Sequence, residues 1–218
     1  MYQALIFDLD GTLLDTIRDI TEAINHALSD CGYTYRYDKE GTKSLIGDGV
    51  DMLIARALKE KKGDGDAFSR FKSVYMPYYL AYQNTHTSPF DGILEALKEL
   101  KDRGVDLYIV SNKPDHLVKD LIPKHFGDGL FKEFFGQAEG EPVKPDPHLV
   151  NRIIKKYGYS KDEVLYVGDS LPDVLTAENA KVDCALCTWG YGKYDDPRCQ
   201  NAKYRLSAPK ELLSLPIK

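Results

Sequence analysis

The most informative stretch of this sequence is Phe7-Asp8-Leu9-Asp10-Gly11-Thr12-Leu13-Leu14-Asp15-Thr16, in which two carboxylates follow a short apolar run. Residues 4–7, Ala-Leu-Ile-Phe, contain no polar side chain, which predicts a buried strand that ends at Asp8. The Asp-Leu-Asp-Gly segment after this run predicts a turn at the carboxyl end of the strand. We therefore expect the residues that carry the chemistry to lie at the carboxyl end of this strand.

Beyond residue 84 the sequence alternates between strand-like and helix-like segments. Short apolar runs predict strands over 105–110, 134–135, 164–167 and 182–188, and weak elements over 206–213. Apolar residues at helical spacing predict helices over 93–100, 117–122, 148–157 and 174–180. This alternation predicts an α/β fold with a Rossmann-like, doubly wound parallel sheet.

A block without predicted strands separates the first strand from this alternating region. Helical spacing of apolar residues is found over 15–29, 50–61 and 67–83. We interpret residues 15–83 as a helical cap domain inserted after the first strand. Residues 1–14 and 84–218 then form the α/β catalytic core.

The composition restricts the partners of the chain. A net charge of −5 and a pI near 5.6 argue against a broad nucleic-acid surface and favour small-molecule partners. The four cysteines show no regular framework, and the apolar runs are far shorter than the ~20 residues of a membrane span. We expect a cytoplasmic monomer or homodimer that binds neither nucleic acid nor membrane.

Three polar motifs directly follow predicted strands. They are Asp8 to Thr12, Ser111-Asn112-Lys113, and Gly168-Asp169-Ser170 with Asp173 close behind. In an open parallel sheet the carboxyl ends of central strands converge on one crevice, so these residues should share a site. Several carboxylates brought together repel one another, and a hard divalent cation with oxygen ligands relieves this repulsion. Mg²⁺ is the expected cofactor.

With Lys144-Pro145 added, these motifs resemble those of the haloacid dehalogenase-like superfamily. Within it the chain is most similar to the phosphoglycolate phosphatase-like group with a small helical cap. The four motifs span the chain in the order typical of the family. Asp10 separates the two main chemistries of the superfamily, because dehalogenases of this fold lack that second acidic residue. Phosphoryl chemistry is therefore preferred.

The resemblance implies catalytic roles for Asp8, Asp10 and Lys144. Asp8 is the nucleophile that forms an aspartyl-phosphate. Asp10 protonates the leaving group and then deprotonates the attacking water. Lys144 neutralises charge on Asp8 and on the transferring phosphoryl group.

The resemblance also implies ligands for phosphate and metal. Ser111, the backbone N–H of Asn112, and Thr12 are expected to bind phosphate. Asp8, the backbone carbonyl of Asp10, and Asp169 are expected to bind Mg²⁺. Asp173 is expected to act indirectly, either through water or by orienting Lys144, and it can also cap the helix that starts near Val174.

Substrate selection is assigned to the cap. Residues 46–50, Ile-Gly-Asp-Gly-Val, resemble a cap segment of phosphoglycolate phosphatases, although Asp48 replaces the expected Asn and adds a negative charge. Lys43 and Arg56 are the candidates to meet a substrate carboxylate, and a solvated surface position is the alternative for both. Four tyrosines over 75–82 are spaced for packing on one helix, with an aromatic wall facing the substrate as the lesser option.

We therefore expect a phosphoric monoester hydrolase that acts on a small phosphorylated metabolite, with 2-phosphoglycolate as the first-choice substrate. Pyrophosphate and nucleoside monophosphates are close alternatives, because the core motifs serve each of them. A phosphosugar mutase would keep Asp8 and Asp10 but return the phosphoryl group to the sugar. A protein that binds without turnover is disfavoured, because binding alone does not require this set of residues.

Overall fold

The structure, a computed structural model, describes residues 1–59 and 63–218. Its strands are β1 (Ala4–Phe7), β2 (Leu14–Asp15), β3 (Ser88–Pro89), β4 (Asp106–Pro114), β5 (Glu133–Gln137), β6 (Val164–Gly168), β7 (Asp183–Cys187) and β8 (Tyr204–Leu206). Its α-helices are α1 (Ile17–Asp30), α2 (Lys39–Lys43), α3 (Val50–Ala57), α4 (Gly65–Tyr82), α5 (Ile93–Asp102), α6 (Asp115–Phe126), α7 (His148–Tyr157) and α8 (Leu171–Ala180). Short 3₁₀ helices are η2 (Lys161–Glu163), η3 (Pro197–Asn201) and η4 (Pro209–Ser214).

The main sheet has six parallel strands in the order β5-β4-β1-β6-β7-β8. In the register of the sheet, Phe7 at the end of β1 lies opposite Ile109 of β4 and Val167 of β6. The polar motifs at the carboxyl ends of these three strands therefore lie at the same edge of the sheet. The predicted α/β fold with a doubly wound parallel sheet is confirmed.

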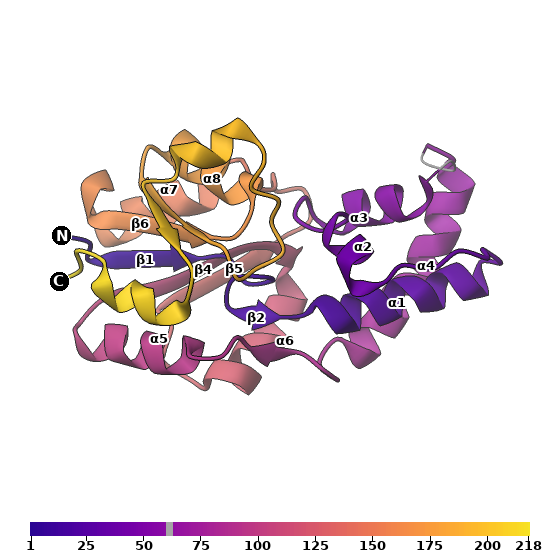
Figure 1. Cartoon of the computed structure of the whole chain (residues 1–218), viewed down its shortest axis with the longest axis horizontal. Helices are drawn as coiled ribbons and strands as arrows, with labels where there is room; N and C mark the ends of the chain where they lie inside the picture. The colour runs from indigo at the N-terminus through magenta and orange to yellow at the C-terminus, as the bar shows by residue number, and fades with distance from the viewer. Residues whose placement is uncertain (60–62) are drawn as a thin grey trace.

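Both faces of the sheet are covered by helices, which explains the unbroken apolar runs of its strands. Leu5 and Phe7 of β1 point into a cluster with α5 and α6, whereas Ala4 and Ile6 point into a second cluster with α7 and α8. All four side chains are fully buried. Figure 1 shows α7 and α8 above β1 and α5 below it. A strand buried on both faces has no polar side to alternate with.

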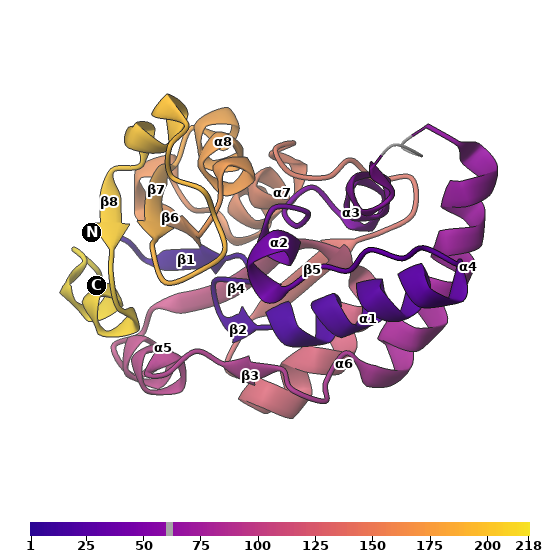
Figure 2. The ribbon, with the colours of Figure 1, turned by 45° about the vertical axis from the view of Figure 1, so that its right-hand side comes forward.

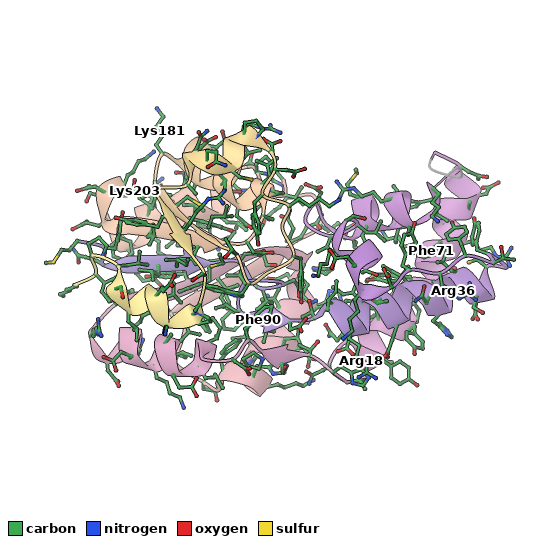
Figure 3. All side chains as sticks on the ribbon, viewed as in Figure 1. Arg18, Arg36, Phe71, Phe90, Lys181 and Lys203 are labelled. Atoms are coloured by element: carbon green, nitrogen blue, oxygen red, sulfur yellow. The ribbon has the colours of Figure 1, made fainter. Side chains whose placement is uncertain are left out.

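The helices α1 to α4 lie together at one end of the molecule (Figure 1). They share a third hydrophobic cluster, which contains Ile24, Ile54 and Phe71, and Phe71 is seen among these helices in Figure 3. Leu117 of α6 also belongs to this cluster, so the core contributes to the packing. We propose that these helices are the cap domain, over residues 15–83, and that residues 1–14 and 84–218 are the catalytic core.

A small antiparallel pair joins the two parts. Leu14 and Asp15 of β2 lie opposite Pro89 and Ser88 of β3, so the chain enters and leaves the cap through neighbouring strands. Figure 2 shows β2 and β3 between the main sheet and the cap helices. The carboxylate of Asp19 strengthens this junction, because it accepts hydrogen bonds from the backbone N–H groups of residues 86 and 87 at 2.9–3.0 Å.

The structure differs from the predicted elements mainly in the cap. Helix α2 was not predicted, because its sequence Lys-Glu-Gly-Thr-Lys carries no apolar pattern. Helix α3 ends at Ala57, and the end predicted for it at residue 61 lies outside the described residues. Helix α8 begins at Leu171, three residues before its predicted start, because Ser170 and not Asp173 is its N-cap residue.

Candidate active site

A cavity of about 440 Å³ opens between the carboxyl edge of the sheet and the cap. Its core side includes Asp8, Asp10, Ser111, Lys144 and Asp169. The two predicted specificity residues of the cap line it too, as do several apolar cap side chains. These apolar cap residues are Ile46, Val50, Leu53 and Met76. The structure therefore brings together residues from motifs that are up to 161 positions apart in the sequence.

The innermost interaction of the site joins Lys144 to two carboxylates. Its Nζ atom lies 2.7 Å from Oδ1 of Asp8 and 2.7 Å from Oδ1 of Asp173. Burial lowers the pKa of Lys144, but the charges of Asp173 and Asp8 reverse this effect and raise the pKa well above its usual value. Lys144 is therefore a permanent cation at the base of the cavity.

Asp173 is held in place from both sides. Its Oδ1 atom accepts from Lys144, and its Oδ2 atom accepts from the backbone N–H and the hydroxyl group of Ser170. This is a capping box at the start of α8, in which Ser170 is the N-cap and Asp173 the third helical residue. Of the two routes predicted for Asp173, the structure favours the orientation of Lys144.

Asp169 is fixed by neighbours on either side of its carboxylate. Oδ2 accepts from the backbone N–H groups of Tyr191 at 2.7 Å and Gly192 at 3.2 Å, and Oδ1 accepts from the hydroxyl group of Thr12 at 3.0 Å. Thr12 was predicted to bind phosphate, but it is fully buried and its hydroxyl group donates to Asp169. The structure thus corrects that role, and Thr12 supports the carboxylate instead.

Glycines at positions 11 and 190 allow the backbone to lie close to the carboxylate of Asp169. Gly11 has φ +89°, and a Cβ atom there would lie 2.6 Å from Oδ2 of Asp169. A Cβ atom at Gly190 would lie 2.5 Å from the same oxygen and 2.2 Å from the carbonyl oxygen of Gly11. A side chain at either position is excluded by contact with Asp169 or with the backbone around it.

The carboxylates of this site carry more negative charge than Lys144 can neutralise. Oxygens of Asp8, Asp169 and Asp173 lie within 4.8 Å of one another, and all three residues are buried. Burial raises the pKa of Asp8 to about 6 although Lys144 opposes the shift, and burial with the charges of Asp173 and Asp8 raises the pKa of Asp169 to about 8. Hard oxygen ligands with excess negative charge fit a divalent cation such as Mg²⁺.

Asp10 also lines the cavity, and its carboxylate has a cationic partner of its own. Its two carboxylate oxygens lie 3.2 and 3.3 Å from Nζ of Lys113, whose side chain is almost fully buried. Lys113 also donates to the hydroxyl group of Tyr79 on cap helix α4. Asp8 and Asp10, the two carboxylates predicted to be catalytic, therefore contact different lysines.

Ser111 and Asn112 lie near the carboxyl end of β4. Ser111 lines the cavity, as predicted for a residue that contacts phosphate. The side chain of Asn112 has a structural use: Nδ2 donates to the carbonyl of Gly47 in the cap at 3.0 Å, and Oδ1 accepts from the backbone N–H of Lys144 at 2.7 Å. Asn112 thus connects the cap to the loop that carries Lys144.

The two cap cations predicted to select the substrate both reach the cavity, but both already have partners. Arg56 forms an ion pair with Asp48 and donates to the carbonyl of Leu45 at 3.1 Å. Lys43 lies 2.9 Å from a carboxylate oxygen of the exposed Glu40. The unexpected negative charge of Asp48 is therefore balanced by Arg56, and it reduces the capacity of Arg56 to bind a substrate carboxylate.

The tyrosines of α4 divide between packing and the cavity. Tyr75 and Tyr79 are buried, stack at 5.4 Å and also line the cavity, whereas Tyr82 is 52% exposed. Tyr75 and Tyr79 therefore pack within the helical part and also line the cavity, which were the two alternatives considered for these tyrosines.

Sequence reasoning assigned no role to two residues of the site. Lys113 was part of a quoted motif, and its position just after Ser111 and Asn112 was the signal that could have identified it. Tyr191 follows β7, a strand whose carboxyl end meets the same crevice. Its hydroxyl group accepts from the backbone N–H of Thr16 at 2.6 Å and donates to Asp15 at 2.7 Å, so Tyr191 connects Asp169 to the start of the cap.

The chain matches the family model described as haloacid dehalogenase-like hydrolase over residues 5–187. It belongs to this family. The match covers all of the core motifs, from Asp8 through Asp173, and the cap between them. The identification made from the motifs is thus confirmed.

Relatives within the family point to one subgroup. The chain is 32% identical over 213 residues to a phosphoglycolate phosphatase of Aquifex aeolicus, covering 98% of this chain and 96% of that protein. It is 34% identical over 194 residues to a phosphoglycolate phosphatase of Aliivibrio fischeri, covering 86% and 84%. Among solved structures it is similar to a predicted phosphoglycolate phosphatase from Haemophilus somnus, with a TM-score of 0.89, 29% identity, and coverage of 98% and 97%.

These matches extend over nearly the whole chain, so the likeness includes the cap as well as the core. The predicted resemblance to the phosphoglycolate phosphatase-like group is confirmed. The chain is accordingly an enzyme of the phosphoric monoester hydrolase type. In the residues that the structure describes, no helix combines the length and the apolar character needed to cross a bilayer.

Proposed function

We propose that this hydrolase removes the phosphoryl group from a small organic phosphate monoester through an aspartyl-phosphate on Asp8. The observation that carries the proposal is the contact of Asp8 with Lys144 at 2.7 Å, at the base of a cavity that Asp10 also lines. Lys144 favours the ionised form of Asp8 against the burial that raises its pKa, and the ionised carboxylate can attack the phosphorus of a dianionic ester. Ser111 lines the same cavity, and we propose that its hydroxyl group binds a phosphoryl oxygen.

In the first step a carboxylate oxygen of Asp8 attacks phosphorus, and the bond between phosphorus and the ester oxygen breaks. Asp10 gives a proton to the departing alkoxide. In the second step a water molecule attacks the phosphorus of the aspartyl-phosphate and loses its proton to Asp10, which releases inorganic phosphate and restores the carboxylate of Asp8. Lys144 balances the charge that collects around Asp8 in both steps.

We propose that Asp8, Asp169 and the backbone carbonyl of Asp10 hold Mg²⁺. When bound, the cation neutralises phosphoryl oxygens and holds the substrate in line with the nucleophile. Asp173 and Thr12 then serve the site indirectly, because they orient Lys144 and Asp169.

For the substrate we propose 2-phosphoglycolate, which the names of the relatives from Aquifex aeolicus and Aliivibrio fischeri support. Two observations favour a second candidate. A cavity of about 440 Å³ with apolar cap residues lies in the size range of pockets for drug-sized ligands, which suits a larger organic phosphate such as a nucleoside monophosphate. The ion pair between Arg56 and Asp48 also favours this second candidate, because it reduces the capacity of Arg56 to bind a substrate carboxylate.

The test is phosphate release from 2-phosphoglycolate, pyrophosphate, nucleoside monophosphates, phosphosugars and p-nitrophenyl phosphate, each with Mg²⁺ and with EDTA. We expect Mg²⁺-dependent release that is fastest with 2-phosphoglycolate. Preference for nucleoside monophosphates would replace the substrate and keep the reaction. Isomerised phosphosugar without net release would indicate a mutase, and no reaction with any compound would refute the proposal.

A further inference from the structure

Lys113 is a buried cation that the proposed mechanism does not use. Its side chain is 2% exposed, and its Nζ atom contacts both carboxylate oxygens of Asp10 and the hydroxyl oxygen of Tyr79. An ammonium group has three N–H donors, and these three oxygens are three acceptors. The arrangement therefore occupies the donors of Lys113 within the protein and leaves little capacity for a substrate.

The three residues come from three separate segments. Asp10 lies in the turn after β1, Lys113 lies near the end of β4, and Tyr79 lies on cap helix α4. The cap therefore reaches Asp10 through the ammonium group of Lys113. Asn112, the residue before Lys113, binds the cap as well, through the carbonyl of Gly47.

Tyr79 is itself held firmly within the cap. It is 4% exposed and stacks on Tyr75 at 5.4 Å, and Tyr75 stacks on Phe71 at 6.2 Å. This row of rings lies in the hydrophobic cluster shared by the cap helices. The position of the Tyr79 hydroxyl group is thus set by the position of α4 as a whole.

We propose that Lys113 is a positioning residue for Asp10 and that Tyr79 makes this positioning depend on the placement of the cap. The inference rests on the proposed function and deepens it. Asp10 must face first the leaving oxygen and then a water molecule, and small errors in the placement of such a group lower rates strongly. Lys113 holds the carboxylate by both oxygens, and the cap completes this support when Tyr79 is in contact.

The test uses Lys113→Met and Tyr79→Phe, which remove the ammonium group and the hydroxyl group while keeping most of the side-chain volume. The matched controls are Lys119→Met, at a side chain that is 63% exposed, and Tyr82→Phe, at the exposed tyrosine of the same helix. The substrates are 2-phosphoglycolate and ethyl phosphate, which share a poor leaving group and differ in the carboxylate.

We expect Lys113→Met to lower kcat by about 10- to 100-fold on both substrates, and Tyr79→Phe by about 3- to 10-fold, because general acid–base catalysis contributes roughly 10²–10⁴-fold. KM should stay within about threefold, and both controls should match the wild type. In an Asp10→Asn background, Lys113→Met should cause less than about a twofold further loss, because the residue through which it acts is already changed.

Four results would overturn the inference. A rise in KM for 2-phosphoglycolate alone would make Lys113 a ligand of the substrate carboxylate. An equal further loss in the Asp10→Asn background would make its role purely structural. An active Lys113→Met enzyme with wild-type kcat would refute positioning and leave the proposed function intact, whereas a wild type without turnover on any substrate would refute both.

Discussion

The ammonium group of Lys144 lies 2.7 Å from Oδ1 of Asp8, and the side chains of both residues are at least 90% buried. A buried ion pair of this kind contributes little net stability, but the loss of one partner leaves the other charge in a poorly solvated place. Because Lys144 also contacts Asp173, and Asp169 lies close to both of these carboxylates, Lys144 balances a group of carboxylates and not one partner alone. In the proposed mechanism, catalysis therefore depends on the same contact as stability.

Asp8→Asn should abolish turnover and keep the fold. The substitution is nearly isosteric, but the amide cannot form the covalent bond to phosphorus, and we expect kcat to fall by about 10⁴-fold or more. Phosphate release measures the activity, and far-UV circular dichroism with thermal unfolding measures the fold. Turnover close to the wild-type rate would remove Asp8 as the nucleophile.

Lys144→Met should destabilise the protein as well as inactivate it. Removing the cation leaves buried carboxylates without their partner, and we expect a loss of about 3–5 kcal/mol in the free energy of unfolding at neutral pH. Urea denaturation measures this loss. Lys119→Met, at an exposed ion pair with Asp115, is the control and should cost no more than about 1 kcal/mol. Similar values for both variants would contradict the argument.

The metal-free protein should lose stability as the pH rises from about 4 to about 8. The pKa of Asp8 is raised to about 6 and that of Asp169 to about 8 in the folded state, whereas the unfolded chain titrates near 3.8. Between these values the folded state binds more protons than the unfolded state, so unfolding becomes easier as protons are removed. The melting temperature in EDTA, followed over this range, checks the direction.

Mg²⁺ should raise the melting temperature more at pH 8.5 than at pH 6. Protons compete with the cation for the same carboxylates, so binding strengthens as they are lost. Asp169→Asn should remove most of the Mg²⁺-dependent increase and serves as the control. An increase that does not depend on pH, or that survives in this variant, would place the cation elsewhere.

Asp19→Ala should weaken the junction between cap and core. The carboxylate of this buried residue accepts from the backbone N–H groups of His86 and Thr87 and from the hydroxyl group of Thr87. Without it these donors lose their partner, which costs about 1–3 kcal/mol for a buried group. Urea denaturation and limited proteolysis near residues 83–88 measure the effect. Glu22→Gln, at an exposed carboxylate of the same helix, should behave as the wild type.

The core of the fold was predictable because its strands are buried on both sides. Residues 4–7 and 164–167 are apolar throughout, and the structure places each of them inside. The expected convergence of motifs at one edge followed from the parallel sheet alone. The same reasoning could not find β2 and β3, because each has two residues and is defined only by its pairing with the other.

The candidate site was predictable where a residue type carries its own chemistry and less so where it serves another residue. Asp8, Asp10, Lys144 and Asp169 line one cavity, as the motifs led us to expect. Thr12 was predicted to contact phosphate, whereas its hydroxyl group contacts Asp169, because sequence spacing does not reveal which way a hydroxyl group points. The partners of Lys43 and Arg56 were also hidden, since Lys43 pairs with Glu40 within helix α2, which was not predicted, and only the folded cap brings Arg56 close to Asp48.

The pairing of β2 with β3 affects how the cap segment between them can be exchanged. The chain enters the cap after Asp15 and leaves it before Ser88, and these two residues lie opposite each other in the β2–β3 pair. The two ends of the cap segment are therefore no farther apart than one pair of strands. A helical segment of another length or sequence can be exchanged at this point without altering the order of the core strands. In the proposed mechanism, substrate choice can then be replaced as a unit, while Asp8, Asp10 and Lys144 keep their proposed roles.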